Sequence, residues 1–296
     1  MKEKPFSKYQ ILANAVMIIW TLAIILPFIL LFMSSITDEN TLVANGYSFF
    51  PKKFSLASYS YIIKSGGQIL TAYGVSIGVT VVGTLLNVLL SALMAYPLSV
   101  KNLPGRNVMM FFVFFTMLFN GGIVPSYIMW TGTFHIKDTI FAQLLPNFLL
   151  SAWNVMMIRT YFTTSIPDGL YEAAEIDGAS QFTIFWKIVL PLGKPILVTM
   201  GTFAGLAYWN DWTNGLYYIV KNTGLYNVQN LLNQMVQNIQ FLTQSSNSNV
   251  TAAASTIPAT GIQMAIAFVA ILPIMLIFPS FQKYYAKGIA LGAVKG

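Results

Sequence analysis

The acidic side chains of this sequence gather in one short polar segment. Asp168, Glu172, Glu175 and Asp177 lie within ten residues of a chain that holds nine Asp and Glu in all. Carboxylates can act as acid–base groups, or they can accept charge-assisted hydrogen bonds from Arg or Lys of a partner. With no cysteine and one histidine, His135, thiolate chemistry and a histidine metal cluster are excluded. We predict no catalytic residue and no metal site.

The acidic segment, residues 165–191, has the punctuation of two short helices. Pro167 and Asp168 suit the first turn of a helix, where an N–H is spare and negative charge is favoured. Gly178 can end that helix in a left-handed conformation, and Ser180 can cap the next one. Pro191 should limit the second helix. The segment is therefore predicted to form a bent helical hairpin.

Two features of this hairpin favour docking to another protein. Small Ala173 and Ala174 permit a close approach, and Glu172 and Asp177 offer acceptors on the flanks. The alternative is an amphipathic helix that rests on lipid headgroups. Such helices are usually rich in Lys and Arg, whereas this one is acidic and would be repelled by an anionic leaflet. From the residues alone we hold both interpretations open.

The chain lacks a phosphate-binding loop of the Walker A type. Its Gly193-Lys194 pair is followed by Pro195, where the motif requires Ser or Thr. We therefore expect that ATP and Mg²⁺ are not bound here, and that any nucleotide is handled by another chain.

The elements that position the hairpin must be membrane helices. Hydrophobic residues make up 56% of the chain and charged residues only 8%. A membrane span needs about twenty mostly apolar residues. Inside the bilayer a helix satisfies all of its own backbone hydrogen bonds, so we interpret these segments as helices. The predicted fold class is an all-α membrane protein with six transmembrane helices, at approximately Ile11–Ser34, Ala72–Leu98, Val108–Trp130, Thr139–Arg159, Leu192–Trp212 and Gly261–Ser280.

The basic residues indicate the orientation. The net charge of +7 is not concentrated in a stripe, so we do not expect nucleic acid as a partner. Placing both termini in the cytoplasm puts most of the sixteen Lys and Arg in inner segments, as basic loops prefer. We divide the chain into a cytoplasmic tail (1–10), a transmembrane domain (11–280) and a second cytoplasmic tail (281–296). The low-complexity stretch Thr243–Thr251 is read as an exposed outer loop.

A polar stripe on the fourth predicted span could line a solute path. Gln143, Asn147 and Asn154 would lie within roughly 40° of one another on a continuous helix. Buried amides should face the bundle, where they could meet sugar hydroxyls. Alternatively, they bond to neighbouring helices.

Further candidates for solute contact are Asn120 and three aromatic residues, Tyr208, Trp209 and Trp212. Flat aromatic faces can pack against the C–H face of a sugar. The competing interpretation is anchoring at the membrane interface, where Trp and Tyr are enriched. His135 lies beside Lys137 and Asp138 in a short outer loop and is interpreted as a solvated side chain.

The hairpin resembles a known family. Glu172-Ala173-Ala174-x-x-Asp177-Gly178-Ala179, followed by Ile188-x-Leu190-Pro191, is similar to the EAA motif of ATP-binding-cassette importer permeases. The resemblance implies a coupling helix that sits in a cleft of a nucleotide-binding subunit. The implied coupling residues are Glu172, Ala173, Ala174, Asp177, Gly178, Ala179, Leu190 and Pro191.

Other matches resemble the maltose-type carbohydrate-uptake class of this family. They are Phe50-Pro51 with Phe54-Ser55-Leu56, Ala95-Tyr96-Pro97-Leu98-Ser99, Trp209-Asn210-Asp211-Trp212 and the tail from Lys287-Gly288 to Gly296. Within that class, Gly121-Gly122-Ile123-Val124-Pro125 and Asn154-x-x-x-x-Arg159 are similar to a branch that imports uronate-containing and other long oligosaccharides.

The resemblance implies a set of partners. They are a second, homologous permease forming a heterodimer, two cytosolic ATPase subunits that bind ATP and Mg²⁺, an extracellular or periplasmic solute-binding protein, an oligosaccharide and the lipid bilayer. The implied location is the bacterial cytoplasmic membrane. The chain itself is expected to be a transport subunit and not an enzyme.

Two other functions were weighed. An ion-coupled secondary transporter would normally carry ionisable groups inside the membrane, and the predicted spans hold no Asp or Glu well inside. A polytopic enzyme acting on lipid-linked sugar would need convergent carboxylates or a metal site. The one acidic cluster is already explained by docking.

Overall fold

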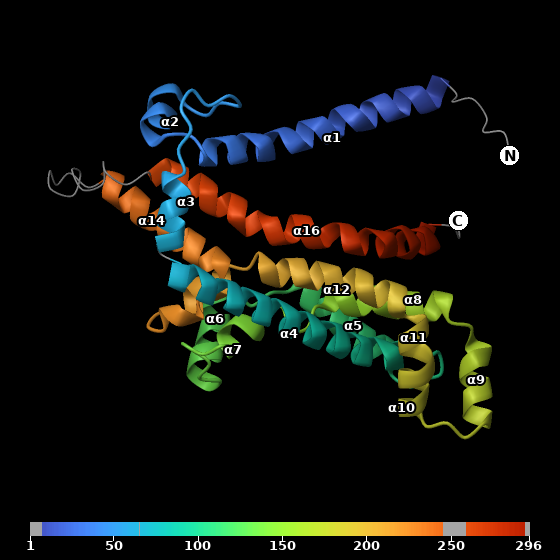
Figure 1. Cartoon of the computed structure of the whole chain (residues 1–296). Coiled ribbons are helices and arrows are strands. Elements are labelled where there is room, and N and C mark those ends of the chain that lie inside the picture. The colour runs from blue at the N-terminus through green and yellow to red at the C-terminus, as the bar shows by residue number, and fades with distance from the viewer. Residues whose placement is uncertain (1–7, 65, 245–258, 294–296) are drawn as a thin grey trace. The chain divides into compact units, whose positions relative to one another are not determined.

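The computed structural model describes residues 8–64, 66–244 and 259–293 (Figure 1). Over these ranges the chain folds into helices, with one isolated antiparallel bridge between Thr37 and Phe54. This confirms the predicted all-α class. The predicted outer loop at Thr243–Thr251 lies mostly outside the described residues, and its first two residues end helix α14 (Val228–Gln244).

Three of the described helices are long and apolar enough to cross a membrane. They are α1 (Lys8–Ser35), α4 (Gly66–Ser99) and α16 (Ala259–Ala293). Two bent pairs raise the number of candidate spans to five if each pair is one span. Proline lies inside α1 and α4, and both helices continue through it.

The third predicted span is sharply bent. Helix α5 (Arg106–Leu118) meets the segment Ile123–Thr133, formed by α6 (Ile123–Ile128) and the π-helix η1, at 108°. The Asn120 side chain accepts the N–H of Gly122 at 2.8 Å, and Gly122 has a φ of +85°. This turn, which glycine adopts without steric cost, replaces the continuous helix we expected.

The fourth predicted span is not one helix. The helical parts of this span are α7 (Phe141–Leu144) and the first part of α8 (Ala152–Ser165), which continues past the predicted end. Pro146 has no N–H to continue the helix, and Asn147 has a left-handed φ of +68°. The prediction of an unbroken span at Thr139–Arg159 is therefore wrong.

The chain forms two compact units, each described here by itself. Unit 1 comprises Met1–Ile69 and Leu232–Pro273. In it, the carboxylate of Glu39, the first residue of α2 (Glu39–Asn45), accepts the N–H groups of Thr260 and Gly261 at 2.9 and 2.8 Å. A negative charge there stabilises the start of α16. Helix α3 (Ala57–Lys64) packs its Ile62 against Ile262 and Ile266.

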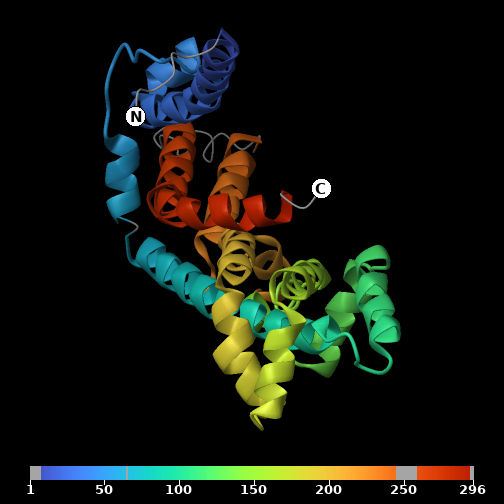
Figure 2. The ribbon, with the colours of Figure 1, turned by 90° about the vertical axis from the view of Figure 1, so that its right-hand side faces the viewer.

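Unit 2 comprises Leu70–Leu231 and Ile274–Gly296. Its main core lies among α4, α8, the hairpin helices and α12 (Lys194–Trp209). Its remaining elements are α9 (Asp168–Ile176), α10 (Gln181–Ile184), the π-helix η2 (Phe185–Val189), α11 (Leu190–Leu192), α13 (Thr213–Tyr218) and the 3-10 turn η3 (Thr223–Leu225). Figures 1 and 2 show α9 and α10 side by side, projecting beyond α8 and α12.

Candidate functional site

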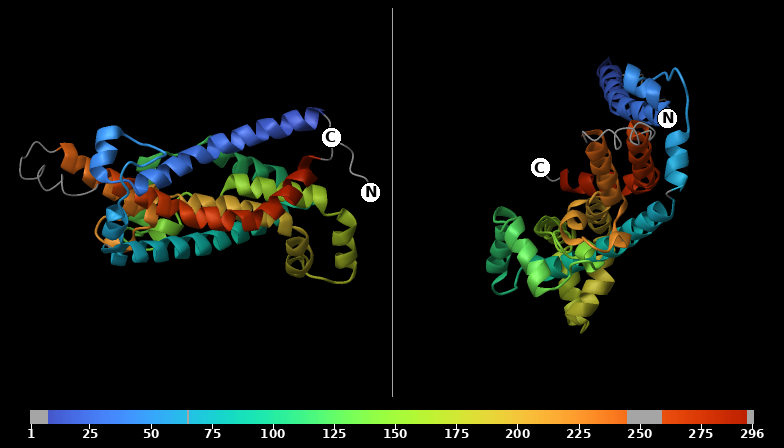
Figure 3. Two further views of the ribbon diagram at one scale, coloured as in Figure 1. Left: turned by 45° about the horizontal axis from the view of Figure 1, so that its top comes forward. Right: turned by 90° about the vertical axis from the view of Figure 1, so that its left-hand side faces the viewer.

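The first helix of the hairpin starts one residue later than predicted. Helix α9 begins at Asp168, and Pro167 precedes it in an extended conformation. Asp168 lies in the first turn, where its charge complements the unpaired N–H groups. Figure 3 shows the hairpin projecting from unit 2 in further views.

Gly178 ends α9 as predicted. Its φ is +75°, and two hydrogen bonds close the turn, from Ala179 N to Ala174 O at 2.9 Å and from Gly178 N to Glu175 O at 3.0 Å. This pattern is the glycine-dependent helix end in which the last carbonyls are satisfied by following amides. The sharp turn between the two helices therefore depends on glycine.

The second helix also begins as predicted but ends later. The Ser180 hydroxyl accepts the N–H of Thr183 at 3.3 Å. Pro191 does not stop the helix, because it falls in the first turn of α11, where its missing N–H costs little. Gly193 stands at the break instead, and α12 follows after a bend of 78°. A Cβ on Gly193 would lie 2.5 Å from Phe162 Cε1 and 2.9 Å from Val189 O.

The hairpin has an inner and an outer face. Ala174 is buried in the core of unit 2, with Ala179 and Leu190 half-buried beside it. The remaining predicted coupling residues, Glu172, Ala173, Asp177, Gly178 and Pro191, are exposed. Of the two alanines, only Ala173 is thus free to approach a partner.

Two apolar side chains on the hairpin escaped the sequence analysis. Ile176 is 86% exposed and Phe182 is 67% exposed. For Ile176 the signal that could have found it is an apolar residue flanked by Glu175 and Asp177 at a helix end, whereas Phe182 lies between polar Gln181 and Thr183 in the first turn of α10. Exposed apolar groups within a polar rim are the usual composition of a protein contact surface.

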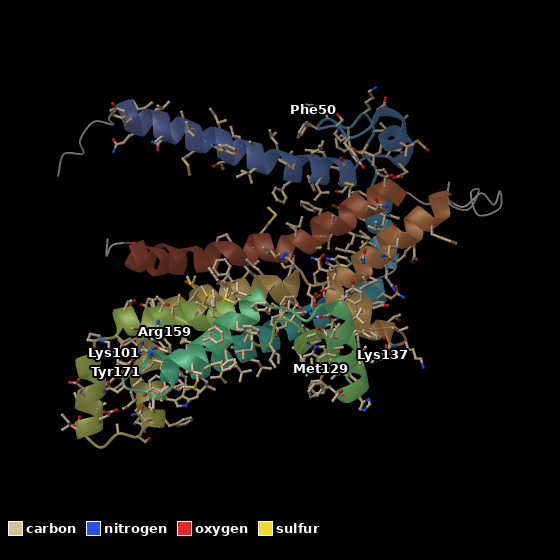
Figure 4. The ribbon with its side chains drawn as sticks, turned by 180° about the vertical axis from the view of Figure 1, so that it is seen from behind. Phe50, Lys101, Met129, Lys137, Arg159 and Tyr171 are labelled. Carbon is tan, nitrogen blue, oxygen red and sulfur yellow. The ribbon has the colours of Figure 1, made fainter. Side chains whose placement is uncertain are left out.

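Several contacts tie the hairpin to the bundle. Lys101, just after α4, forms an ion pair with Asp168 of the hairpin. Close by, Arg159 Nε of α8 donates to Leu98 O of α4 at 3.1 Å, which joins the two bundle helices beside the hairpin. Figure 4 shows Lys101, Arg159 and Tyr171 grouped at the end of unit 2 that carries the hairpin. Burial raises the pKa of the Tyr171 hydroxyl above its ordinary value. Lys101 was not among the predicted residues.

The three predicted amides do not form one stripe, because the helix breaks between them. Gln143 is buried and donates to Leu225 O and Asn230 Oδ1, both at 3.2 Å. Asn154 is buried and donates to Asn87 Oδ1 at 2.7 Å. The prediction of a common helical face is wrong, and these two amides bond to neighbouring elements.

Asn147 differs from its two companions. It is exposed, and its Nδ2 donates to Asn214 Oδ1 at 3.2 Å. Asn120, also exposed, holds the turn at Gly122. Both retain an exposed amide that a solute could reach, so solute contact remains a prediction for them.

The aromatic candidates divide in the same way. Tyr208 is buried, and its hydroxyl donates to Leu144 O at 2.9 Å. Its ring packs against Gly83, where an added Cβ would lie 2.5 Å from Tyr208 Cζ. Trp209 is buried and 6.3 Å from the ring of Tyr73. Trp212 is 44% exposed, so part of its side chain is accessible from the surroundings.

Asp211 was quoted in the sequence only as part of a motif, yet it organises this region. It is buried, and its Oδ1 accepts the N–H groups of Thr213 and Asn214 at 3.0 and 3.2 Å. These bonds fix the start of α13. Its main-chain oxygen accepts from Asn227 Nδ2 at 2.6 Å.

A second anchor lies in the predicted outer loops. Asp138 Oδ1 accepts the N–H groups of Val220 and Lys221 at 2.7 Å each and that of Asn222 at 3.3 Å. These bonds, with that from Lys221 foremost, lower the pKa of the Asp138 carboxyl. The neighbouring His135 has a φ of +52°. Among the described residues, no three His, Cys, Asp or Glu side chains group as a metal site.

The fold and this site define a permease of an ATP-driven importer. Residues 74–291 match the family model described as "Binding-protein-dependent transport system inner membrane component", and the chain belongs to this family. Members of this family are inner membrane components of transport systems, which confirms the predicted class and the expectation of a transport subunit.

Particular relatives share almost the whole chain. Protein LplC of Bacillus subtilis is 36% identical, over 92% of this chain and 90% of the relative. The polygalacturonan/rhamnogalacturonan transport system permease protein YtcP of the same species is 35% identical, over 97% and 98%. A chain of a bacterial ABC transporter involved in the import of the acidic polysaccharide alginate is similar in structure, with a TM-score of 0.79, 26% identity, and coverage of 96% and 100%.

Proposed function

We propose that this chain carries an oligosaccharide across the bacterial cytoplasmic membrane as one permease half of an importer. The observation that carries the proposal is the projecting hairpin, whose exposed Glu172, Asp177 and Ile176 form an acidic and apolar docking face. The names of the relatives, which include a polygalacturonan/rhamnogalacturonan transport permease and an ABC transporter involved in alginate import, support a carbohydrate as the cargo.

The docking face would enter a cleft of a cytosolic ATPase subunit. The implied assembly has a second, homologous permease, two ATPase subunits that bind ATP and Mg²⁺, and an external solute-binding protein. Both termini would be cytoplasmic, with the broken segment that carries α7 and α8 crossing the membrane as a sixth span beside the five candidates. The hairpin would then lie inside, in agreement with the bias of Lys and Arg toward inner segments. Closure of the ATPases would push α9 and rearrange the two permeases between inward-facing and outward-facing states.

The proposed solute path uses groups that the bundle leaves exposed. Asn120, Asn147 and Trp212 fit this role best, because each is an exposed amide or aromatic side chain of unit 2. Gln143, Asn154, Tyr208 and Trp209 would act indirectly, by holding the surrounding elements in place.

Energy coupling tests the proposed function. Membrane vesicles that hold the complete importer and its external binding protein are supplied with radiolabelled polygalacturonate and alginate oligosaccharides. We expect uptake of an oligosaccharide that depends on ATP, is abolished by vanadate and persists when an uncoupler collapses the ion gradient. Uptake that resists vanadate and stops with the uncoupler would show an ion-coupled transporter instead.

A further inference from the structure

The C-terminal end of α4 is joined to both helices of the hairpin by a chain of two hydrogen bonds. Tyr96 Oη donates to Gln181 Oε1 at 2.5 Å, and Gln181 Nε2 donates to Glu175 Oε1 at 2.8 Å. Tyr96 belongs to α4, Gln181 to α10 and Glu175 to α9. The end of α4, distant in sequence, therefore meets the two consecutive hairpin helices through three side chains.

The chemistry of these groups fixes which atom donates in each of the two hydrogen bonds. An ionised carboxylate only accepts hydrogen bonds, so the amide NH₂ of Gln181 must face Glu175. The amide oxygen then faces Tyr96, whose hydroxyl donates. A side chain at position 181 needs both a donor and an acceptor, which an amide supplies.

The tyrosine ring is held on two sides. Its centroid lies 6.4 Å from that of Tyr171 of α9, with the rings stacked, and 5.4 Å from that of Phe185 of η2. Tyr96 itself is buried. These contacts aim the hydroxyl at Gln181, and they mean that movement of either hairpin helix would displace the ring.

The residue after Tyr96 makes the end of α4 easier to bend. Pro97 follows Tyr96 directly and lies inside the helix. Proline cannot donate the backbone bond to the preceding turn, so helices bend most easily there. The last turn of α4 can thus tilt while the rest of the helix keeps its packing.

We propose that Tyr96, Gln181 and Glu175 form a relay that makes the end of α4 move together with the hairpin when the ATPases close. This inference rests on the proposed function. The three are positioning residues: they transmit the displacement of α9 and α10 to a membrane helix. Glu175, although exposed, then bonds within the hairpin, whereas Glu172 is left for the docking face.

The relay is tested in the assembled importer with spin labels on Asn102→Cys, just after α4, and Lys187→Cys, in η2 of the second hairpin helix and outside the docking face. Both positions are exposed, and the chain has no other cysteine. With an intact relay, the distance between the labels should be the same without nucleotide and with ATP and vanadate. In Tyr96→Phe and Gln181→Leu it should shift with ATP and vanadate, because the two ends no longer move together.

Matched variants separate the relay from docking. Glu175→Gln keeps an acceptor oxygen and should retain the constant distance, whereas Glu175→Leu should lose it. Combining Tyr96→Phe with Gln181→Leu should add no further shift, since both remove the same link. An unchanged distance in Gln181→Leu, additive shifts, or a Glu175→Gln variant that behaves as Glu175→Leu does would overturn the relay. If the parent chain does not retain the ATPase subunits during purification, the proposed function itself fails.

Discussion

Neighbouring residues of the EAA motif have opposite surroundings. Ala174 packs in the core of unit 2, while Glu172 and Ala173 face outward on the same helix. The motif therefore combines one position that fixes α9 on the bundle with others that are available to a partner. Substitutions at the exposed positions should change binding without changing the fold.

Charge reversal at Glu172 tests the docking face. We expect Glu172→Lys to remain inserted in the membrane but to retain the ATPase subunits roughly tenfold less well, because a like charge would face the partner's Arg or Lys. Co-purification of the ATPase with the solubilised importer measures this. Glu172→Gln, which keeps an acceptor, is the control and should lose less. Equal retention in all three proteins would contradict the docking role.

The turn at Gly178 gives a second prediction at this scale. Proline cannot adopt the φ of +75° found at Gly178, because its ring fixes φ near −65°. We expect Gly178→Pro to leave the chain in the membrane while abolishing transport and weakening ATPase co-purification, because the hairpin can no longer close. Gly169→Ala in α9, where an added Cβ meets nothing within 4 Å, is the matched control and should transport normally. Normal uptake by Gly178→Pro would contradict the assignment.

The Asp138 anchor predicts a pH dependence. Because hydrogen bonds lower the pKa of Asp138 in the folded chain, its contribution to stability is complete above the unfolded pKa of about 3.9 and is lost as pH falls through the lower folded value. The difference in Tm between the parent and Asp138→Ala should thus be constant above about pH 5 and shrink in stronger acid. A difference that grows on acidification would show that another group is responsible.

Residue-scale predictions succeeded where the rule was local. Gly178 and Ser180 were placed correctly, because a helix end and a cap depend on a few adjacent residues. The stripe of Gln143, Asn147 and Asn154 failed, because its geometry assumed a helix that Pro146 interrupts.

At the scale of elements, bends in the predicted spans shape unit 2. The turn at Gly122 and the break at Gly193 each redirect a helical segment, by 108° and 78°. Sequence patterns identified the apolar segments that form α1, α4, α16 and the two bent pairs, since composition sets membrane preference, but the span predicted at Thr139–Arg159 is not among them. They missed the bends, which depend on side-chain bonds and close packing with distant residues, such as that of Gly193 against Phe162.

Packing at the second bend is open to mutation. Gly193→Ala would place a Cβ too close to Phe162 and to the backbone oxygen of Val189. We expect a loss of roughly 1–3 kcal/mol, as for other overpacked sites, measured as a lower thermal unfolding temperature in detergent. Gly169→Ala should not lower it, since alanine favours a helix and has room there. Equal unfolding temperatures for the two variants would refute the close packing.

At the scale of the molecule, the labelled residues of unit 2 lie at two opposite ends. Lys101, Arg159 and Tyr171 lie at the end with the hairpin, and Met129 and Lys137 lie at the other end (Figure 4). This separation agrees with a coupling end in the cytoplasm and a solute-facing end outside. The likeness to family members extends over both ends, since the family match runs from residue 74 to 291.

Site-specific cross-linking in the assembled importer tests the central claim most directly. The chain has no cysteine, so a photoreactive maleimide can be attached to Ile176→Cys on the hairpin or to Met129→Cys at the opposite end. Both side chains are exposed. We predict an adduct between this chain and the ATPase from position 176 and none from position 129. No ATPase adduct from position 176, in a complex that still contains the ATPase, would contradict the account.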